Sequence, residues 1–205
     1  MVKRKKAQAS AKQPSDAASV ILPGALFLGP CSSASSAPFL TAKSINHVLS
    51  IGSTPSPKVE GVTYHRLSLN DSITSSITTT VDAATKIIEA TLCSNKGRER
   101  ILVHCSAGVS RSPTVVCGYL MKEHGMTLKA ALGLIICART QASPNPGFLS
   151  QLKQLEITLL GSSTVDINEL PRRETDRLAL FNEDSDDDDK EEAQSVDTAT
   201  HRNKQ

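Results

Sequence analysis

Residues 104–112, which read HCSAGVSRS, place a cysteine and an arginine at a spacing suited to phosphate chemistry. Arg111 follows Cys105 by six positions. A thiolate can attack phosphorus directly, and a guanidinium can pair with two phosphate oxygens, which a lysine does poorly. We therefore predict that Cys105 is a catalytic nucleophile and that Arg111 binds the phosphoryl group, so that Arg111→Lys loses most activity.

The residues around Cys105 are predicted to form a phosphate-binding loop. The apolar run 101–103 indicates a buried strand and residues 110–123 indicate a helix, so the loop joins a strand to a helix N-terminus. Backbone N–H groups there lack helical partners, and the helix dipole favours an anion. The same amides are expected to lower the pKa of the Cys105 thiol. The predicted phosphate-binding residues are Ser106, Ala107, Gly108, Val109, Ser110 and Arg111.

Two neighbours of the loop are given different roles. Ser112 can donate a hydrogen bond to the sulfur when the thiolate leaves phosphocysteine, which makes it a catalytic candidate for a second step. His104 precedes Cys105 on a strand, so its side chain points to the opposite face and is expected to brace the loop rather than relay protons. The remaining cysteines are expected to be small buried hydrophobes: Cys31, Cys93, Cys117 and Cys137.

Loss of an alkoxide or phenolate from phosphorus needs a proton, which an aspartic acid can supply. The predicted strand at residues 62–69 is followed by Asn70 and Asp71 in a polar segment, and Asp71 is our candidate for the general acid. From the residues alone, Asp71 is equally well an ordinary turn or helix N-cap residue. Asp82 is the fallback, but it lies in an amphipathic stretch typical of a helix surface.

With these motifs in view, the chain resembles the small atypical dual-specificity phosphatases of the protein tyrosine phosphatase superfamily. The resemblance covers roughly residues 20–160 and rests also on LFLG, ND, GYLMK and SPNPGF followed by QL, which stand at 26–29, 70–71, 118–122, 143–148 and 151–152. It implies that Asp71 is the general acid. It also implies that Asn145 hydrogen-bonds near the loop, although from spacing alone Asn145 is a polar turn residue.

The pattern of the whole chain predicts an α/β fold like that of the protein tyrosine phosphatases. We expect a central, twisted, mostly parallel sheet of about five strands, with helices on both faces. The expected strands are 20–22, 25–28, 46–51, 62–69 and 100–104. The predicted organisation is a disordered basic segment (1–19), a catalytic domain (20–160), and a C-terminal extension (161–205) with a short helix or docking segment before an acidic tail.

The predicted activity is two-step hydrolysis of phosphotyrosine and phosphoserine or phosphothreonine through phosphocysteine. The loop carries no lysine, which favours phosphoprotein substrates over multiply charged lipid headgroups or RNA ends, and aromatic residues make up only 3% of the chain, which argues against nucleic acid. Two alternatives are a phosphoprotein-binding adaptor and a sulfur-transfer or arsenate-reducing enzyme. A single turnover assay would separate the adaptor, which binds without releasing phosphate.

Composition sets the remaining expectations. Five cysteines without a Cys-x-x-Cys pair suggest a reducing compartment and no metal or cofactor. No apolar stretch reaches the length of a bilayer span, so we expect no membrane partner and a cytoplasmic protein. The basic run 3–6 is interpreted as plain solubilising charge, and the alternative is a nuclear-import signal that would add a nuclear location.

The Cys105 thiolate is expected to be exposed and therefore to be reversibly inactivated by peroxide. A Cys105 side chain packed away from solvent would speak against catalysis. The sequence does not indicate an oligomeric state.

Overall fold

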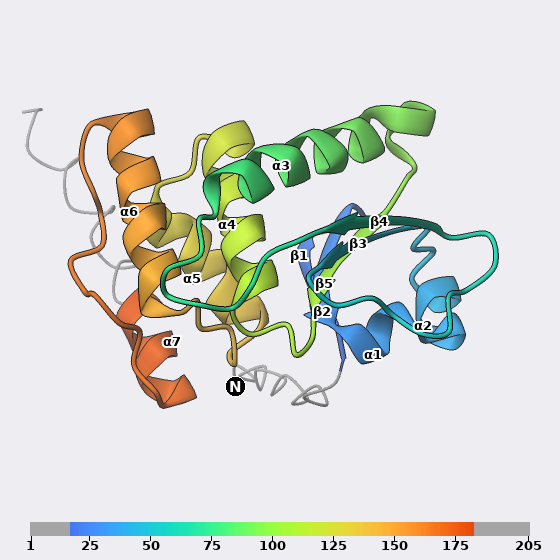
Figure 1. The fold of residues 1–205 in the computed structure, drawn as a ribbon, viewed down its shortest axis with the longest axis horizontal. Helices are drawn as coiled ribbons and strands as arrows, with labels where there is room; N and C mark the ends of the chain where they lie inside the picture. The colour runs from blue at the N-terminus through green and yellow to red at the C-terminus, as the bar shows by residue number, and fades with distance from the viewer. Residues whose placement is uncertain (1–16, 183–205) are drawn as a thin grey trace, which may run out of the picture.

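Five strands form one sheet at the centre of the molecule in this computed structural model, which describes residues 17–182 (Figure 1). In chain order they are β1 (Ser19–Leu22), β2 (Leu26–Pro30), β3 (His47–Ile51), β4 (Thr63–Leu67) and β5 (Ile101–Cys105). Their order across the sheet is β1-β2-β5-β3-β4. Only β1 is antiparallel to its neighbour, which confirms the predicted mostly parallel sheet of five strands.

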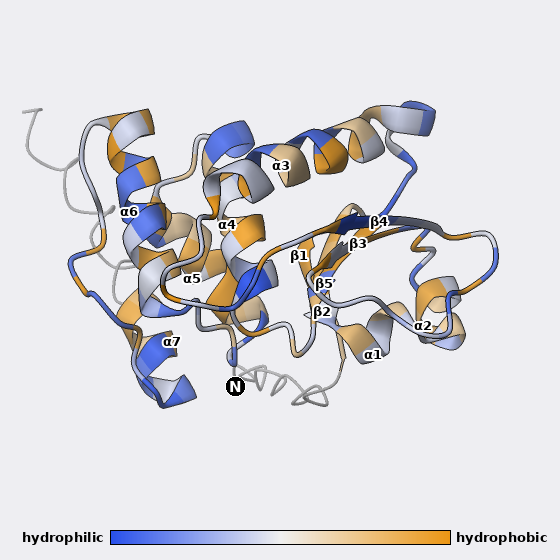
Figure 2. Cartoon of the chain, in the orientation of Figure 1, coloured by the Kyte–Doolittle hydropathy of each residue, from blue (hydrophilic) through white to orange (hydrophobic). Residues whose placement is uncertain are grey.

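The central position of β5 follows from its side chains. All five of its residues are buried, as expected for a parallel strand covered on both faces. Alternate residues enter different cores: Ile101 and Val103 join the larger apolar cluster, and Leu102 joins the smaller one. By contrast, β4 at the sheet edge is only half-buried, and Figure 2 shows it in hydrophilic colour.

Helices cover both faces of the sheet, as predicted. The smaller core contains residues of two short helices, α1 (Cys31–Ala34) and α2 (Ala37–Ala42). The larger core lies beneath the long helices, which are α3 (Thr78–Cys93), α4 (Arg111–His124), α5 (Leu128–Ala138) and α6 (Pro146–Leu160). A 3-10 turn, η1 (Ser94–Gly97), follows α3. Figure 1 shows α4 beside the sheet with α5 and α6 beyond it.

Two apolar stripes with a repeat of about 3.6 residues predict helices with buried faces, and they differ in outcome. One stripe is Leu128, Ala131, Leu132, Ile135 and Ile136, and the other is Phe148, Leu152, Leu155 and Leu159. The buried residues of α5 are all those in its predicted stripe: Leu128, Ala131, Leu132, Ile135 and Ile136. In α6 the stripe is confirmed at Phe148 and Leu152, which are fully buried, but Leu159 is 42% exposed. The prediction of a core position at Leu159 is wrong, because the last turn of α6 carries three solvent-exposed apolar residues, Ile157, Leu159 and Leu160.

The chain continues past α6 along the same core. Val165 and Leu170 are buried in the larger cluster, and α7 (Glu174–Asn182) then packs against α5. The basic run 3–6 and the acidic tail from residue 183 onward lie outside the described residues. No helix within residues 17–182 is long and apolar enough to span a bilayer.

Candidate active site

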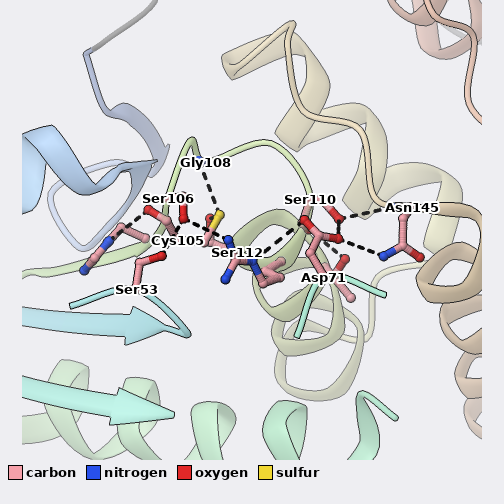
Figure 3. A network of polar contacts seen from close by, with 11 residues as sticks. Ser53, Asp71, Cys105, Ser106, Gly108, Ser110, Ser112 and Asn145 are labelled. Atoms are coloured by element: carbon pink, nitrogen blue, oxygen red, sulfur yellow. Dashed lines mark hydrogen bonds and ion pairs between the residues drawn. The ribbon is translucent and has the colours of Figure 1, made fainter. Parts of the chain in front are cut away.

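The Cys105 sulfur lies at the carboxyl end of the central strand, inside the loop that leads to α4. It accepts hydrogen bonds from the Gly108 backbone N–H and the Ser112 hydroxyl, each at 3.3 Å (Figure 3). Burial alone would raise the pKa of this thiol. Hydrogen bonds from the Ser112 hydroxyl, from the Ser112 and Gly108 amides, and the nearby Arg111 charge outweigh that effect, so the pKa lies below its ordinary value. The geometry therefore favours a thiolate.

The expectation that Cys105 is exposed is wrong. The residue is 2% exposed, because it pairs with Pro30 across the sheet and the following loop encloses the sulfur. Burial of this kind was expected to speak against catalysis. Here the groups around the sulfur include hydrogen-bond donors and the Arg111 charge as well as residues of the larger core, so burial accompanies a lowered pKa instead of a raised one.

Arg111 is the first residue of α4, and its guanidinium lies over the loop. One terminal nitrogen, Nη2, donates to the Ser106 hydroxyl at 2.9 Å, and Ser106 in turn lies 2.5 Å from the Ser53 hydroxyl. The Arg111 Nε is buried and has no hydrogen-bond partner within residues 17–182. Gly52 leaves room for this side chain, since a Cβ there would stand 2.5 Å from Arg111 Nη1. The guanidinium is therefore held at the loop by Ser106, and its Nε N–H makes no hydrogen bond to the described residues.

Asp71 reaches the loop from the segment that follows β4. Its Oδ1 accepts hydrogen bonds from the Ser110 hydroxyl at 2.7 Å and from Asn145 Nδ2 at 2.8 Å, and its Oδ2 lies 3.8 Å from Arg111 Nε (Figure 3). The Asp71 side chain remains 39% exposed. The fallback Asp82 is instead paired with Lys122, near the opposite end of α4 from Arg111. The structure thus brings Asp71, and not Asp82, to the loop.

Asn145 connects the Asp71 segment to α6. Its Oδ1 caps α6 by accepting from the Phe148 N–H at 2.9 Å, while its Nδ2 donates to Asp71. Its own N–H donates to the Ser110 hydroxyl at 3.2 Å. One residue therefore joins the start of α6, the aspartate and the phosphate loop.

His104 is buried on the face of β5 opposite to Cys105. Its Nε2 lies 2.8 Å from the Ser50 hydroxyl on β3, and its Nδ1 lies 3.1 Å from the Cys105 carbonyl oxygen. Burial lowers the pKa of the imidazole, and the bond to the Cys105 carbonyl opposes this only partly. A neutral ring that links two strands matches a bracing role.

Three residues at the site were missed by sequence reasoning: Gly52, Ser53 and Arg139. Gly52 and Ser53 directly follow β3, and the carboxyl ends of parallel strands meet at one edge, so their position carried a usable signal. Arg139 follows α5, and its guanidinium donates to the carbonyls of Ala107 and Gly108. Nothing in its local sequence indicated this contact.

The other cysteines only partly match the prediction that they are buried. Cys117 is fully buried, and both burial and the Glu156 carboxylate raise the pKa of its thiol. Cys31 is half-buried. Cys93 and Cys137 are exposed, which contradicts the prediction, because they lie on the outer sides of α3 and α5.

Comparison with known proteins gives one consistent family. Residues 26–158 match the family model for the dual specificity phosphatase catalytic domain. Dual specificity protein phosphatase 1B of Arabidopsis thaliana is 37% identical over 139 residues, which cover 67% of this chain and 81% of that protein. Human dual specificity protein phosphatase 22 is 37% identical over 136 residues, covering 66% and 72%. The crystal structure of human DUSP28 matches with a TM-score of 0.64 and 29% identity, covering 74% of this chain and 99% of that one.

Proposed function

Since this chain belongs to the dual specificity phosphatase family and is a cysteine-based protein phosphatase, we propose that it hydrolyses phosphotyrosine and phosphoserine or phosphothreonine through a phosphocysteine formed on Cys105. The observation that carries the proposal is the Cys105 sulfur, which has a lowered pKa and accepts bonds from Gly108 and Ser112. A thiolate held in this way is a nucleophile at neutral pH.

In the first step the Cys105 thiolate attacks phosphorus, and the bond between phosphorus and the ester oxygen breaks. The loop amides and the Arg111 guanidinium hold the phosphoryl oxygens, because donors fixed before the reaction stabilise charge that develops in the transition state. Asp71, protonated at this stage, gives its proton to the leaving oxygen. The contacts of Asp71 with Ser110 and Asn145 support this assignment, because they hold its carboxyl beside the loop.

In the second step the Asp71 carboxylate takes a proton from water, and the water oxygen attacks the phosphocysteine. The sulfur–phosphorus bond breaks, inorganic phosphate forms, and the thiolate is restored. Ser112 donates to the departing sulfur, consistent with its present hydrogen bond at 3.3 Å. Asp71 ends protonated, ready for the next cycle.

Phosphoproteins are the substrate class that the loop chemistry favours. Besides Arg111, every residue from Ser106 to Ser112 is uncharged, so the loop offers one cation to one phosphoryl group. A headgroup with several phosphates would need further cations to offset its charge.

The test compares Cys105→Ser with wild type on phosphotyrosine and phosphothreonine peptides and an aryl phosphate. Wild type is expected to give a burst of one phosphoenzyme per chain in rapid-quench experiments, trapped on the Cys105 peptide. Cys105→Ser is expected to bind peptides without turnover, whereas the matched control Cys93→Ser, which removes an exposed thiol on α3, keeps full activity. Turnover by Cys105→Ser, or binding without phosphate release by wild type, would refute the proposal.

A further inference from the structure

Arg139 is a buried cation directed at the outer side of the phosphate loop. It follows the last residue of α5 and is 3% exposed. Its Nε donates to the Gly108 carbonyl at 2.7 Å, its Nη2 donates to the Ala107 carbonyl at 2.8 Å, and its Nη1 donates to the Ala17 carbonyl at 2.9 Å. One guanidinium therefore fixes two consecutive peptide units of the loop.

Because of peptide geometry, the contacts of Arg139 with the loop carbonyls also fix the direction of the loop N–H groups. In a trans peptide unit the C=O and the N–H point in opposite directions. The Ala107 carbonyl shares its peptide unit with the Gly108 N–H, which donates to Cys105 Sγ at 3.3 Å. By holding that carbonyl outward, Arg139 directs the Gly108 N–H at the sulfur. The Gly108 carbonyl likewise shares its unit with the Val109 N–H, which is turned away from Arg139.

The Gly108 backbone depends on this support. Its φ is +68°, a conformation that L side chains rarely adopt, and a Cβ there would lie 2.6 Å from the Gly29 carbonyl carbon and oxygen. A glycine backbone can adopt many conformations, so the peptide units on either side of Gly108 easily change direction unless neighbouring groups hold them. Arg139 supplies that restraint at both carbonyls.

We propose that Arg139 is a positioning residue for the phosphatase reaction, which sets the direction of the loop amides that stabilise the Cys105 thiolate and bind the phosphoryl group. The proposal rests on the proposed function of Cys105. It adds a residue that never touches the reacting atoms yet determines how well the loop receives them.

The C-terminal helix extends this support beyond the matched domain, which ends at residue 158. Arg177 of α7 is 5% exposed, and its Nε and Nη2 donate to the Thr140 carbonyl at 3.1 and 2.9 Å. Its Nη1 donates to the carbonyls of Pro171 and Arg172. The Thr140 hydroxyl also donates to Glu174 at 2.5 Å. Because Thr140 directly follows Arg139, α7 secures the backbone from which the guanidinium reaches the loop.

The test uses Arg139→Lys, Arg139→Met and Arg177→Met in the full chain. The readouts are the Cys105 thiol pKa, from the pH dependence of iodoacetamide alkylation at the Cys105 peptide, inhibition by inorganic phosphate, and kcat and KM separately. For Arg139→Met we expect a raised thiol pKa, about tenfold weaker inhibition by phosphate, and a fall in kcat/KM of roughly 10- to 100-fold, since small misplacements of catalytic groups have effects of this size. Arg139→Lys is expected to recover part of each loss, and Arg177→Met to change all three in the same direction but less.

Lys153→Met is the matched control. Its Nζ lies 3.4 Å from the carbonyls of Asp166 and Ile167, so it also removes a cation that holds the C-terminal segment, but it contacts neither Thr140 nor the loop. It is expected to change the melting temperature at most and to leave the thiol pKa at the wild-type value.

A folded Arg139 variant with wild-type thiol pKa and phosphate inhibition would overturn the proposal. If neither Arg139 variant folds, Arg177→Met decides, and an unchanged thiol pKa in that variant overturns it. Alkylation and phosphate inhibition need no turnover. A wild type that fails to hydrolyse phosphopeptides would therefore refute the proposed function, while these two measurements would still report on Arg139.

Discussion

At the residue scale, the shape of the Arg111 side chain matters as much as its charge. Its Nη2 donates to Ser106, while its buried Nε has no hydrogen-bond partner in the described part of the chain and lies 3.8 Å from Asp71 Oδ2. A lysine offers one nitrogen and cannot serve both positions. Arg111→Lys is therefore expected to lose about 100-fold or more in kcat/KM, the usual effect of removing one preorganised donor. Steady-state kinetics on an aryl phosphate check this, and more than a third of wild-type activity in the variant would contradict it.

The Ser112 hydroxyl donates to the Cys105 sulfur, so its loss should appear in the pH profile. The Ser112 hydroxyl is the largest of the groups that lower the pKa of the Cys105 thiol. In Ser112→Ala that pKa rises, so the thiolate forms at higher pH and the acidic limb of kcat/KM moves upward in pH. Activity is lost first at low pH and partly returns at high pH.

The control for Ser112→Ala is Thr85→Val. The Thr85 hydroxyl is also buried, but it has no hydrogen-bond partner in the described part of the chain and lies on α3. Its removal is expected to leave the acidic limb in place and to cost little stability. An acidic limb that stays at its wild-type position in Ser112→Ala would show that the hydroxyl does not stabilise the thiolate.

Substitution of Asp71 and substitution of Asp82 should have different effects on the hydrolysis of substrates with poor leaving groups. If Asp71 protonates the leaving oxygen, Asp71→Ala should slow alkyl phosphates, which leave poorly, far more than activated aryl phosphates. Asp82→Ala breaks only the surface pair with Lys122 and should behave like wild type. The slope of log kcat/KM against leaving-group pKa measures the difference, and equal slopes in both variants would remove Asp71 from the role.

At the element scale, Asn145 both caps α6 and donates to Asp71, and two substitutions separate these contacts. Asn145→Ala removes the oxygen that caps α6 and should cost about 1 kcal/mol of stability. Asn145→Ser restores a capping oxygen but not the Nδ2 donor to Asp71. We expect thermal melting to show stability regained in Asn145→Ser, while kcat stays several-fold below wild type. Wild-type kcat in Asn145→Ser would mean that Asp71 does not need this hydrogen bond.

Helices and strands could be predicted where the local pattern of apolar residues determines the secondary structure. The apolar run before Cys105 indicated β5 and gave its central place, since a strand buried on both faces belongs inside a parallel sheet. The apolar stripe of α6 gave a wrong prediction at Leu159, because periodicity does not show where a helix extends beyond the core into solvent. Arg139 could not be found either, since its function depends on α5 ending beside a loop that lies far away in the sequence.

At the scale of the whole molecule, β5 connects the two cores to the reaction site. Leu102 packs in the smaller cluster and Ile101 and Val103 pack in the larger one, so the position of Cys105 depends on both layers. Beyond α6, Val165 and Leu170 complete the larger core. The catalytic domain proposed for residues 20–160 therefore has neighbours past its C-terminal boundary that contribute to its packing.

A truncation tests that boundary. A chain ending at residue 160 loses the buried Val165 and Leu170 side chains, which together should cost about 4 kcal/mol, or a fall of about 10 °C in Tm for a protein of this size. The reference is a chain ending at residue 182, which keeps α7. Differential scanning calorimetry of the two chains measures the difference, and equal Tm values would show that residues 20–160 are sufficient for stability.

The same pair of chains should differ in pH dependence, because truncation removes donors from a buried carboxylate. Although burial raises the pKa of Glu156, bonds from the Thr164 hydroxyl and N–H and from the Leu128 N–H lower it below its ordinary value. A carboxyl with a lowered folded pKa adds stability above its unfolded pKa and loses it as the pH falls through the folded value. The Tm gap between the chains should therefore be full at neutral pH and narrow below about pH 4. A gap that stays constant down to pH 3 would show that the hydrogen bonds to Glu156 contribute nothing to the stabilisation.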